Sequence, residues 1–137
     1  HVYAAQGRFK EAADTLLKIS PGFYPAGMVE TAARVLRAMP AQVSRPQDLP
    51  AFAAPNLTFV YLYVGAASRA LEYFEAWAKT GYWGVSTDPL WYPAAAPLRK
   101  TERFKALMRN NGYVDYWRAR GWPDHCHPVG ADDFACN

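Results

Sequence analysis

One spacing of residues occurs twice in this chain, and the second copy lies 58 residues after the first. In each copy an aromatic residue precedes a glycine by four positions, and an alanine and a large apolar residue follow it by five and nine. The first copy is Tyr3, Gly7, Phe9, Ala12 and Leu16, and the second is Tyr61, Gly65, Ala67, Ala70 and Phe74. Glycine ends helices because it adopts the left-handed C-cap conformation without a Cβ clash. The spacing therefore predicts two hairpins, each made of a helix, a glycine turn and a second helix.

The residues after each glycine follow the i, i+3, i+4, i+7 pattern of an amphipathic helix. The apolar positions are Phe9, Ala12, Ala13, Leu16, Leu17 and Ile19 in the first copy, and Ala67, Ala70, Leu71, Phe74 and Trp77 in the second. We expect Ala12 and Ala70 to lie where two antiparallel helices cross closely, since a larger side chain would force the helices apart.

The spacing resembles the tetratricopeptide repeat, a family of helical hairpins that stack into a superhelix. Residues 7–12 (GRFKEA) are similar to the turn between the two helices of that repeat, and residues 65–70 (GAASRA) form a weaker copy. The resemblance implies an all-α, tetratricopeptide-like right-handed array (an α–α superhelix). The family's period is about 34 residues. We therefore expect one irregular hairpin or helix between the two copies.

A second resemblance covers the C-terminal part, in the segments LWYP (90–93), PLRKTERF (97–104), YWR (116–118) and GWPD (121–124). They look like the C-terminal end of bacterial multidomain signalling proteins, in which a tetratricopeptide array follows a nucleotide cyclase domain or a winged-helix DNA-binding domain. This resemblance implies a regulatory or scaffolding region. It also implies that any catalytic or DNA-binding part lies upstream.

The first hairpin has only six residues before its glycine, whereas a full helix from about Asn56 to Val64 precedes Gly65. We therefore expect the chain to be an N-terminally truncated fragment of a longer protein. Repeat units bury their faces against neighbouring units, so a truncated end exposes one face. An exposed face at Val2 and Tyr3 would allow a homodimer.

At this length one domain is expected, over residues 1–137. Its expected parts are hairpin 1 at about 1–19, an extra helix at 25–39, a Pro-rich loop at 40–55, hairpin 2 at about 56–79, and C-terminal helices with an irregular Trp/Pro-rich cap at 87–137. Within the last part, Thr101 is expected to cap a helix over 102–110, and a short helix to follow over 113–119. Residues 122–137 show no period, and no strand pattern is convincing.

The net charge of +3 is unevenly distributed. Between residues 99 and 120 only Glu102 and Asp115 oppose seven basic residues, namely Arg99, Lys100, Arg103, Lys105, Arg109, Arg118 and Arg120. The tail carries Asp124, Asp132 and Asp133 and no Lys or Arg. We expect this tail to fold back near the basic helices and the other charges to form a solvated face. Nucleic-acid binding by this piece is not expected, because no recognised motif or dense basic stripe is present.

The two cysteines, Cys126 and Cys136, leave two states open. Free thiols are the default in the cytoplasm, which is the expected location, and a disulfide would point to the periplasm. A zinc site at His125, Cys126, His127 and Cys136 is disfavoured because three adjacent ligands point in different directions. We expect no metal and no cofactor.

Catalytic signatures are also missing from the sequence: there is no Gly-x-Ser-x-Gly, phosphate loop or His-Glu-x-x-His. A Cys126–His127 nucleophile pair is conceivable, but sequence neighbours rarely point at each other. The expected function is therefore protein–protein interaction or intramolecular regulation in a larger protein, non-catalytic by itself. No membrane span is expected, since no apolar run approaches the roughly 18 residues required.

Candidate binding residues come from two arguments. The family resemblance implies that the inner face of the first helix of a hairpin lines a groove, which carries over to Phe59 and Tyr63. The Pro-rich loop covering this face is an equally good interpretation. Tyr82 and Trp83, between two glycines, are expected to form an exposed contact patch. The alternative function is a small-molecule-sensing regulatory domain with a pocket lined by Trp83, Trp91 and Tyr92.

Overall fold

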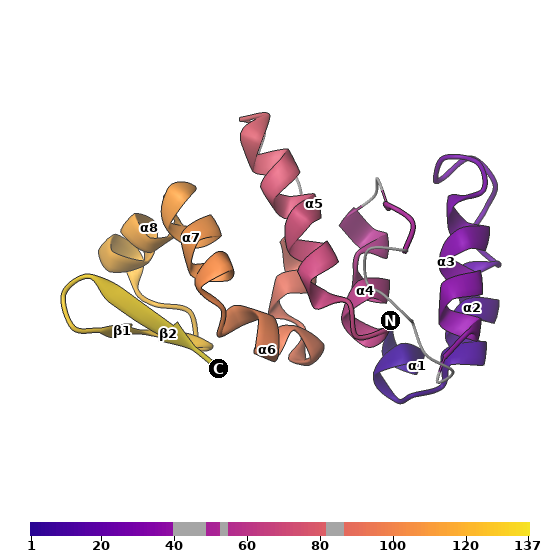
Figure 1. Cartoon of the computed structure of the whole chain (residues 1–137), viewed down its shortest axis with the longest axis horizontal. Helices are drawn as coiled ribbons and strands as arrows, with labels where there is room; N and C mark the ends of the chain where they lie inside the picture. Colours follow the sequence, from indigo (N-terminus) through magenta and orange to yellow (C-terminus); the bar gives the residue numbers. More distant parts are fainter. Residues whose placement is uncertain (40–48, 53–54, 82–86) are drawn as a thin grey trace. The chain divides into compact units, whose positions relative to one another are not determined.

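The computed structural model describes residues 1–39, 49–52, 55–81 and 87–137. Its described part is mostly helical, with one two-stranded sheet near the C-terminus (Figure 1). The chain divides into two compact units, an N-terminal unit of residues 1–73 and a C-terminal unit of residues 74–137. The prediction of a mostly helical chain is confirmed.

The N-terminal unit contains four complete helices and the beginning of a fifth among its described residues. They are α1 (Val2–Ala5), α2 (Phe9–Leu16), α3 (Met28–Arg37), α4 (Phe59–Tyr63), which follows the 3-10 turn η2 (Pro55–Leu57), and α5 (Ala67–Lys79). The expected helix at 25–39 is three residues shorter at its start, because Gly27 takes a left-handed conformation (φ 76°) and Pro25 lies in the turn before it. The full helix expected at 56–64 is instead η2 followed by α4. Most of the expected loop at 40–55 lies outside the described residues.

Both glycines of the repeated spacing end their helices in the same way. Gly7 (φ 73°) and Gly65 (φ 76°) are left-handed. The amide after each glycine donates a hydrogen bond to the tyrosine carbonyl four residues before that glycine: Arg8 N to Tyr3 O at 2.9 Å, and Ala66 N to Tyr61 O at 2.8 Å. This is the longer hydrogen bond of a Schellman cap. The spacing therefore marks two helix C-termini, and the second helix of each hairpin starts two residues after the glycine.

Helix α2 packs on α3, and both helices bury pairs of alanines. Ala12 and Ala13 of α2 are buried, as are Ala32 and Ala33 of α3. Alanine faces let two helices approach closely, which is the role expected for Ala12. Asp14 and Arg37 form an ion pair between the same two helices.

The C-terminal unit contains the rest of α5, the 3-10 turns η3 (Asp88–Trp91) and η4 (Pro93–Ala95), and three helices. These are α6 (Ala96–Arg99), α7 (Glu102–Asn110) and α8 (Tyr113–Arg120). The predicted cap of α7 is confirmed, since the Thr101 side chain accepts a hydrogen bond from Phe104 N at 3.2 Å. Burial of Phe104, Leu107 and Met108 gives α7 its own apolar face.

The prediction that residues 122–137 are irregular is wrong. Strands β1 (Cys126–Val129) and β2 (Asp133–Cys136) pair antiparallel, with Cys126 opposite Cys136 and Val129 opposite Asp133. A three-residue connection that begins with the left-handed Gly130 (φ 63°) joins them. Each strand is four residues long, which is too short for alternation of polar and apolar residues to be recognised in the sequence.

Replacing Gly65 by alanine should lower the free energy of unfolding by about 1–2 kcal/mol, the cost of a left-handed L-residue. An added Cβ would meet nothing within 4 Å, so the cost is conformational rather than steric. Gly65→Asn should cost less, because asparagine tolerates this conformation, and Ser68→Ala on the exposed side of α5 should be nearly neutral. Urea denaturation measures all three. Equal stabilities for Gly65→Ala and Ser68→Ala would contradict the cap.

Candidate functional site

The carried-over groove residues lie on α4. Phe59 is only 6% exposed, and its ring centroid lies 6.3 Å from that of His1 and 6.3 Å from that of Tyr63. Tyr63 is partly exposed. Beside them, α1 packs on α4 and exposes Val2 (60%) and Tyr3 (37%). The surface accessible here is thus formed by Tyr63 and the outer side of α1, with Phe59 beneath it. Tyr82 and Trp83 lie outside the described residues, and the binding role of all four stays a prediction.

A short part of the Pro-rich segment covers the second hairpin. The Tyr61 hydroxyl accepts a hydrogen bond from Phe52 N at 2.8 Å and donates one to the carbonyl of Pro50. Arg69 donates to Leu49 O at 3.1 Å and lies over the Tyr61 ring. Burial raises the pKa of Tyr61. Residues 49–52 therefore cover Tyr61, whereas the cover expected as an alternative concerns the face of Phe59 and Tyr63, for which it stays a prediction.

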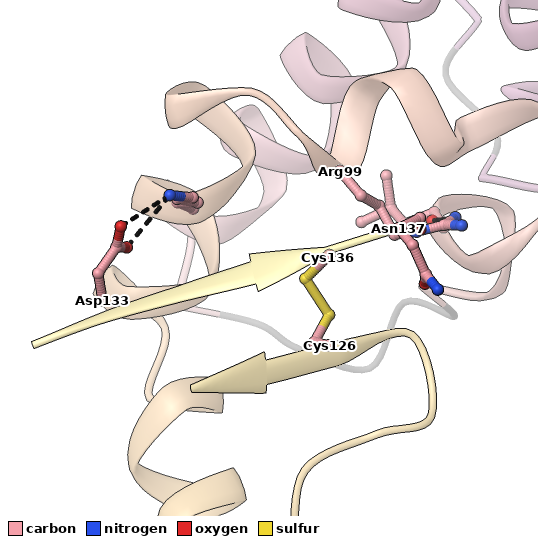
Figure 2. The surroundings of a disulfide bond; sticks show 7 residues. Arg99, Cys126, Asp133, Cys136 and Asn137 are labelled. Atoms are coloured by element: carbon pink, nitrogen blue, oxygen red, sulfur yellow. Dashed lines mark hydrogen bonds and ion pairs between the residues drawn. A yellow bond between two sulfur atoms is a disulfide. The ribbon is translucent and has the colours of Figure 1, made fainter. Parts of the chain in front are cut away.

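Arg99 is the buried cation of the C-terminal unit, with 2% of the residue exposed. It donates to Asn137 O at 2.8 Å through Nε, and to Leu90 O at 2.9 Å and Tyr92 O at 3.0 Å through Nη1. Figure 2 shows Arg99 and Asn137 side by side. Burial lowers the pKa of the guanidinium. In the sequence this arginine belongs to a basic group expected to be solvated, but it instead links η3 to the end of β2.

The β1–β2 hairpin is closed by a disulfide between Cys126 and Cys136 (Figure 2). These residues face each other at a non-hydrogen-bonded pair, because the flanking Asn137 N donates to His125 O at 2.9 Å. Side chains approach most closely at such a pair, and the Cα atoms are 4.1 Å apart. A cross-link over 10 residues stabilises a chain by about 3 kcal/mol in the loop-entropy account.

Phe134 anchors the hairpin to α8. It is fully buried, and its ring centroid lies 5.6 Å from that of Trp117 and 5.8 Å from that of Trp122. Trp117 in turn contacts Trp91 and Tyr113. Trp91, Trp122 and Phe134 therefore form one aromatic cluster around Trp117.

The acidic tail does fold back on the basic helices. Asp133 accepts hydrogen bonds from Lys105, with the closer oxygen at 2.9 Å, and forms an ion pair with Arg109. Arg118 donates to Ala131 O at 3.0 Å in the loop between the strands. Arg103 pairs with Glu75 at 2.6 Å. Glu75 and Asp133 therefore offset part of the local basic excess within the unit.

A hollow of about 450 Å³ opens beside this cluster, lined by Trp91, Asn111, Gly112, Tyr113, Tyr116 and Trp117. The rings of Trp91 and Trp117 meet at 72° and those of Tyr113 and Trp117 at 44°. Tyr116 is 62% exposed. Of the three residues expected to line a ligand pocket, Trp91 lines this hollow, Tyr92 does not, and Trp83 lies outside the described residues.

The chemistry open to these groups is limited. Neither cysteine offers a thiolate while both sulfurs are bonded to each other. In the described ranges no group of three or more His, Cys, Asp or Glu residues is placed to hold a metal ion. No described helix is both long enough and apolar enough to cross a membrane. Comparisons with family models, curated proteins and solved structures found no match to this chain.

Replacing Arg99 by methionine should lower the free energy of unfolding by roughly 2–4 kcal/mol, because one buried carbonyl (Leu90 O) and two part-buried carbonyls (Tyr92 O and Asn137 O) lose their donor. Lys100→Met is the matched control: it removes a positive charge from the neighbouring, exposed residue and should change stability by less than about 0.5 kcal/mol. Urea denaturation followed by tryptophan fluorescence measures both. A result in which the two variants are equally stable would show that Arg99 does not hold these segments.

The Asp133 contacts should make stability depend on pH. The hydrogen bond from Lys105, more than any other contact, lowers the pKa of Asp133 below 3.8. The contribution of the Asp133 carboxylate to the free energy of unfolding is therefore fully present above 3.8, and it is lost as the pH falls through the lowered pKa. The melting temperature of the protein should exceed that of Asp133→Asn at neutral pH, and the difference should vanish in strong acid.

Asp132→Asn, one residue earlier in the exposed loop, removes the same charge without removing these ion pairs. It should have a smaller effect on the melting temperature at neutral pH. A difference between the protein and Asp133→Asn that persists unchanged into strong acid would contradict the assignment.

Proposed function

We propose that this chain is a protein–protein interaction or intramolecular regulatory module of tetratricopeptide type, part of a larger bacterial signalling protein and non-catalytic by itself. The observation that carries the proposal is the glycine cap that follows Tyr3 and recurs after Tyr61. In both hairpins the cap is followed by a helix with a buried alanine, Ala12 or Ala70. Stacked helical hairpins present helix faces to neighbouring segments.

The proposed contact surface is formed by the outer side of α1 and the exposed edge of Tyr63 on α4. Val2 and Tyr3 are apolar or aromatic and exposed, and the Arg8 guanidinium lies 4.6 Å from the centre of the Tyr3 ring. Because the Arg8 guanidinium is already paired with Glu11, such a surface suits an apolar helix or segment. The proposed occupants are another domain of the same protein, another protein, or a second copy in a homodimer.

The disulfide favours an oxidising compartment such as the periplasm over the cytoplasm, because cytosolic thiols are kept reduced. The cytoplasmic location expected from the sequence assumed free thiols. The described hairpin therefore supports the alternative location that was tied to a disulfide.

A second candidate function is supported by the aromatic hollow of the C-terminal unit. Four of its six lining residues are Trp or Tyr, and ligand sites are lined mainly by apolar and aromatic side chains with a few polar groups. In this alternative the chain senses a small molecule that binds against Trp91 and Trp117. The hollow is open to solvent and Tyr116 at its rim is exposed, so we rank this function second.

Site-specific crosslinking tests the first function without knowledge of the partner. A photoreactive amino acid is placed at position 3, 63 or, as a control, 23 of the parent protein, which is expressed in its own host. Phe23 is aromatic and 71% exposed but lies outside the proposed surface. Positions 3 and 63 should give crosslinks to one defined protein segment, identified by mass spectrometry, and position 23 should not.

Crosslinks from position 23 that match those from positions 3 and 63, or none from any of them, would contradict the interaction function. A small molecule that co-purifies with the protein and is lost in Tyr116→Ala would then favour the second function.

A further inference from the structure

The hairpin formed by β1 and β2 is too small to be stable alone. Two paired strands of four residues have no independent stability in water. Three sets of contacts hold this one: the disulfide within it, the Phe134 ring against Trp117 and Trp122, and the polar contacts of Asp133, Ala131 and Asn137. Of these, the disulfide is the contact that a change of redox conditions removes.

The hairpin covers groups that would otherwise be accessible on α7 and α8. Trp117 is 5% exposed, and the side chain of Lys105 is 11% exposed. Asp133 engages Lys105 and Arg109, and Ala131 engages Arg118. If the hairpin leaves, the Trp117 ring loses its contact with Phe134 and Lys105 becomes accessible, and both then lie near Arg109 and Arg118, whose side chains are already 36% and 47% exposed.

The helices beneath the hairpin have contacts of their own. Thr101 caps α7, Phe104 is buried with its ring 6.0 Å from that of Trp91, and Val114 is buried on α8. Arg99 would lose its bond to Asn137 O but keep those to Leu90 O and Tyr92 O. Release of the hairpin therefore does not require α7 and α8 to unfold.

We propose that the Cys126–Cys136 disulfide is a redox-sensitive latch, whose reduction releases residues 126–137 from α7 and α8 and uncovers a mixed aromatic and basic surface. The reductant is a dithiol. One of its thiolates attacks a cysteine sulfur, the S–S bond breaks, and the other cysteine leaves as a thiolate. The second thiol of the reductant then displaces the attacked cysteine. In total two electrons and two protons pass to the cysteines, and the dithiol becomes a disulfide.

Both cysteines are buried, at 5% and 6% exposure, so attack follows transient opening of the hairpin. The strand β1 is suited to such opening because His127, Pro128 and Val129 are exposed. The inference goes beyond the proposed interaction function and does not depend on it.

Hydrogen exchange measured by mass spectrometry, with and without dithiothreitol, tests the latch on the whole chain. These are the only two cysteines, so the reductant has one target. On reduction, amide protection in residues 126–136 should fall on the order of 100-fold, from the loop entropy of the lost cross-link. Amide protection in residues 104–110 of α7 should change by no more than a few-fold between the oxidised and the reduced protein. Cys126→Ser/Cys136→Ser should behave like the reduced protein and should not respond to dithiothreitol.

Asp133→Asn provides a second, independent variant. It should keep the hairpin protected while the disulfide is intact and should lower its protection further once the disulfide is reduced. Three results would each overturn the latch: free thiols in the air-oxidised protein, protection of residues 126–136 that does not change on reduction, or an equal loss of protection in α7. The last would show that the disulfide supports the whole unit rather than the hairpin.

Discussion

The hydrogen bond from Arg8 N to Tyr3 O, and its counterpart from Ala66 N to Tyr61 O, determine where the chain of the N-terminal unit turns. Each bond closes over a left-handed glycine and ends one helix, so the next helix can begin two residues later. The positions of the buried alanines follow from this start, because Ala12 and Ala70 lie five residues after their glycines. The packing of α1 on α2 therefore depends on a backbone turn that only a few residues specify.

The C-terminal unit is held in a different way, by contacts between residues far apart in the sequence. Arg99 gathers carbonyls from η3, the following residue and the end of β2. Asp133 brings the same hairpin to α7, and Phe134 brings it to Trp117. These contacts give the Arg99 guanidinium and the Asp133 carboxylate hydrogen-bond partners, and they bury the Phe134 ring. Together they hold the disulfide-closed hairpin in place.

The local parts of the fold could be predicted from the sequence. The glycine turns, the extent of α5, the Thr101 cap and the bounds of α7 follow from spacing and capping residues alone. The hairpin could not be predicted, because it depends on a cross-link that the two cysteines left open and on an aromatic cluster assembled from separate segments. The burial of Arg99 likewise depends on tertiary partners, whereas the basic residues around it in the sequence predicted that it would be solvated.

The candidate surfaces divide in the same way. Tyr63 was named through the family resemblance, and the exposed face at Val2 and Tyr3 was expected from the short first helix; both residues are exposed. Phe59, from the same resemblance, proved to be covered. The aromatic hollow was anticipated only at Trp91, because Tyr113 and Tyr116 reach it through the turn at Gly112. The spacing of residues thus predicts which helix a residue belongs to. Its burial depends on segments that are distant in the sequence.

One helix cap is built twice in this chain, and couplings through hydrogen bonds test the repetition most directly. In an NMR experiment on the isotope-labelled chain, scalar couplings should connect the Arg8 nitrogen with the Tyr3 carbonyl carbon, and the Ala66 nitrogen with the Tyr61 carbonyl carbon. Observation of both couplings would establish the repeated cap. Couplings from these amides to the carbonyls of Ala4 and Leu62, as in an uninterrupted helix, would contradict it.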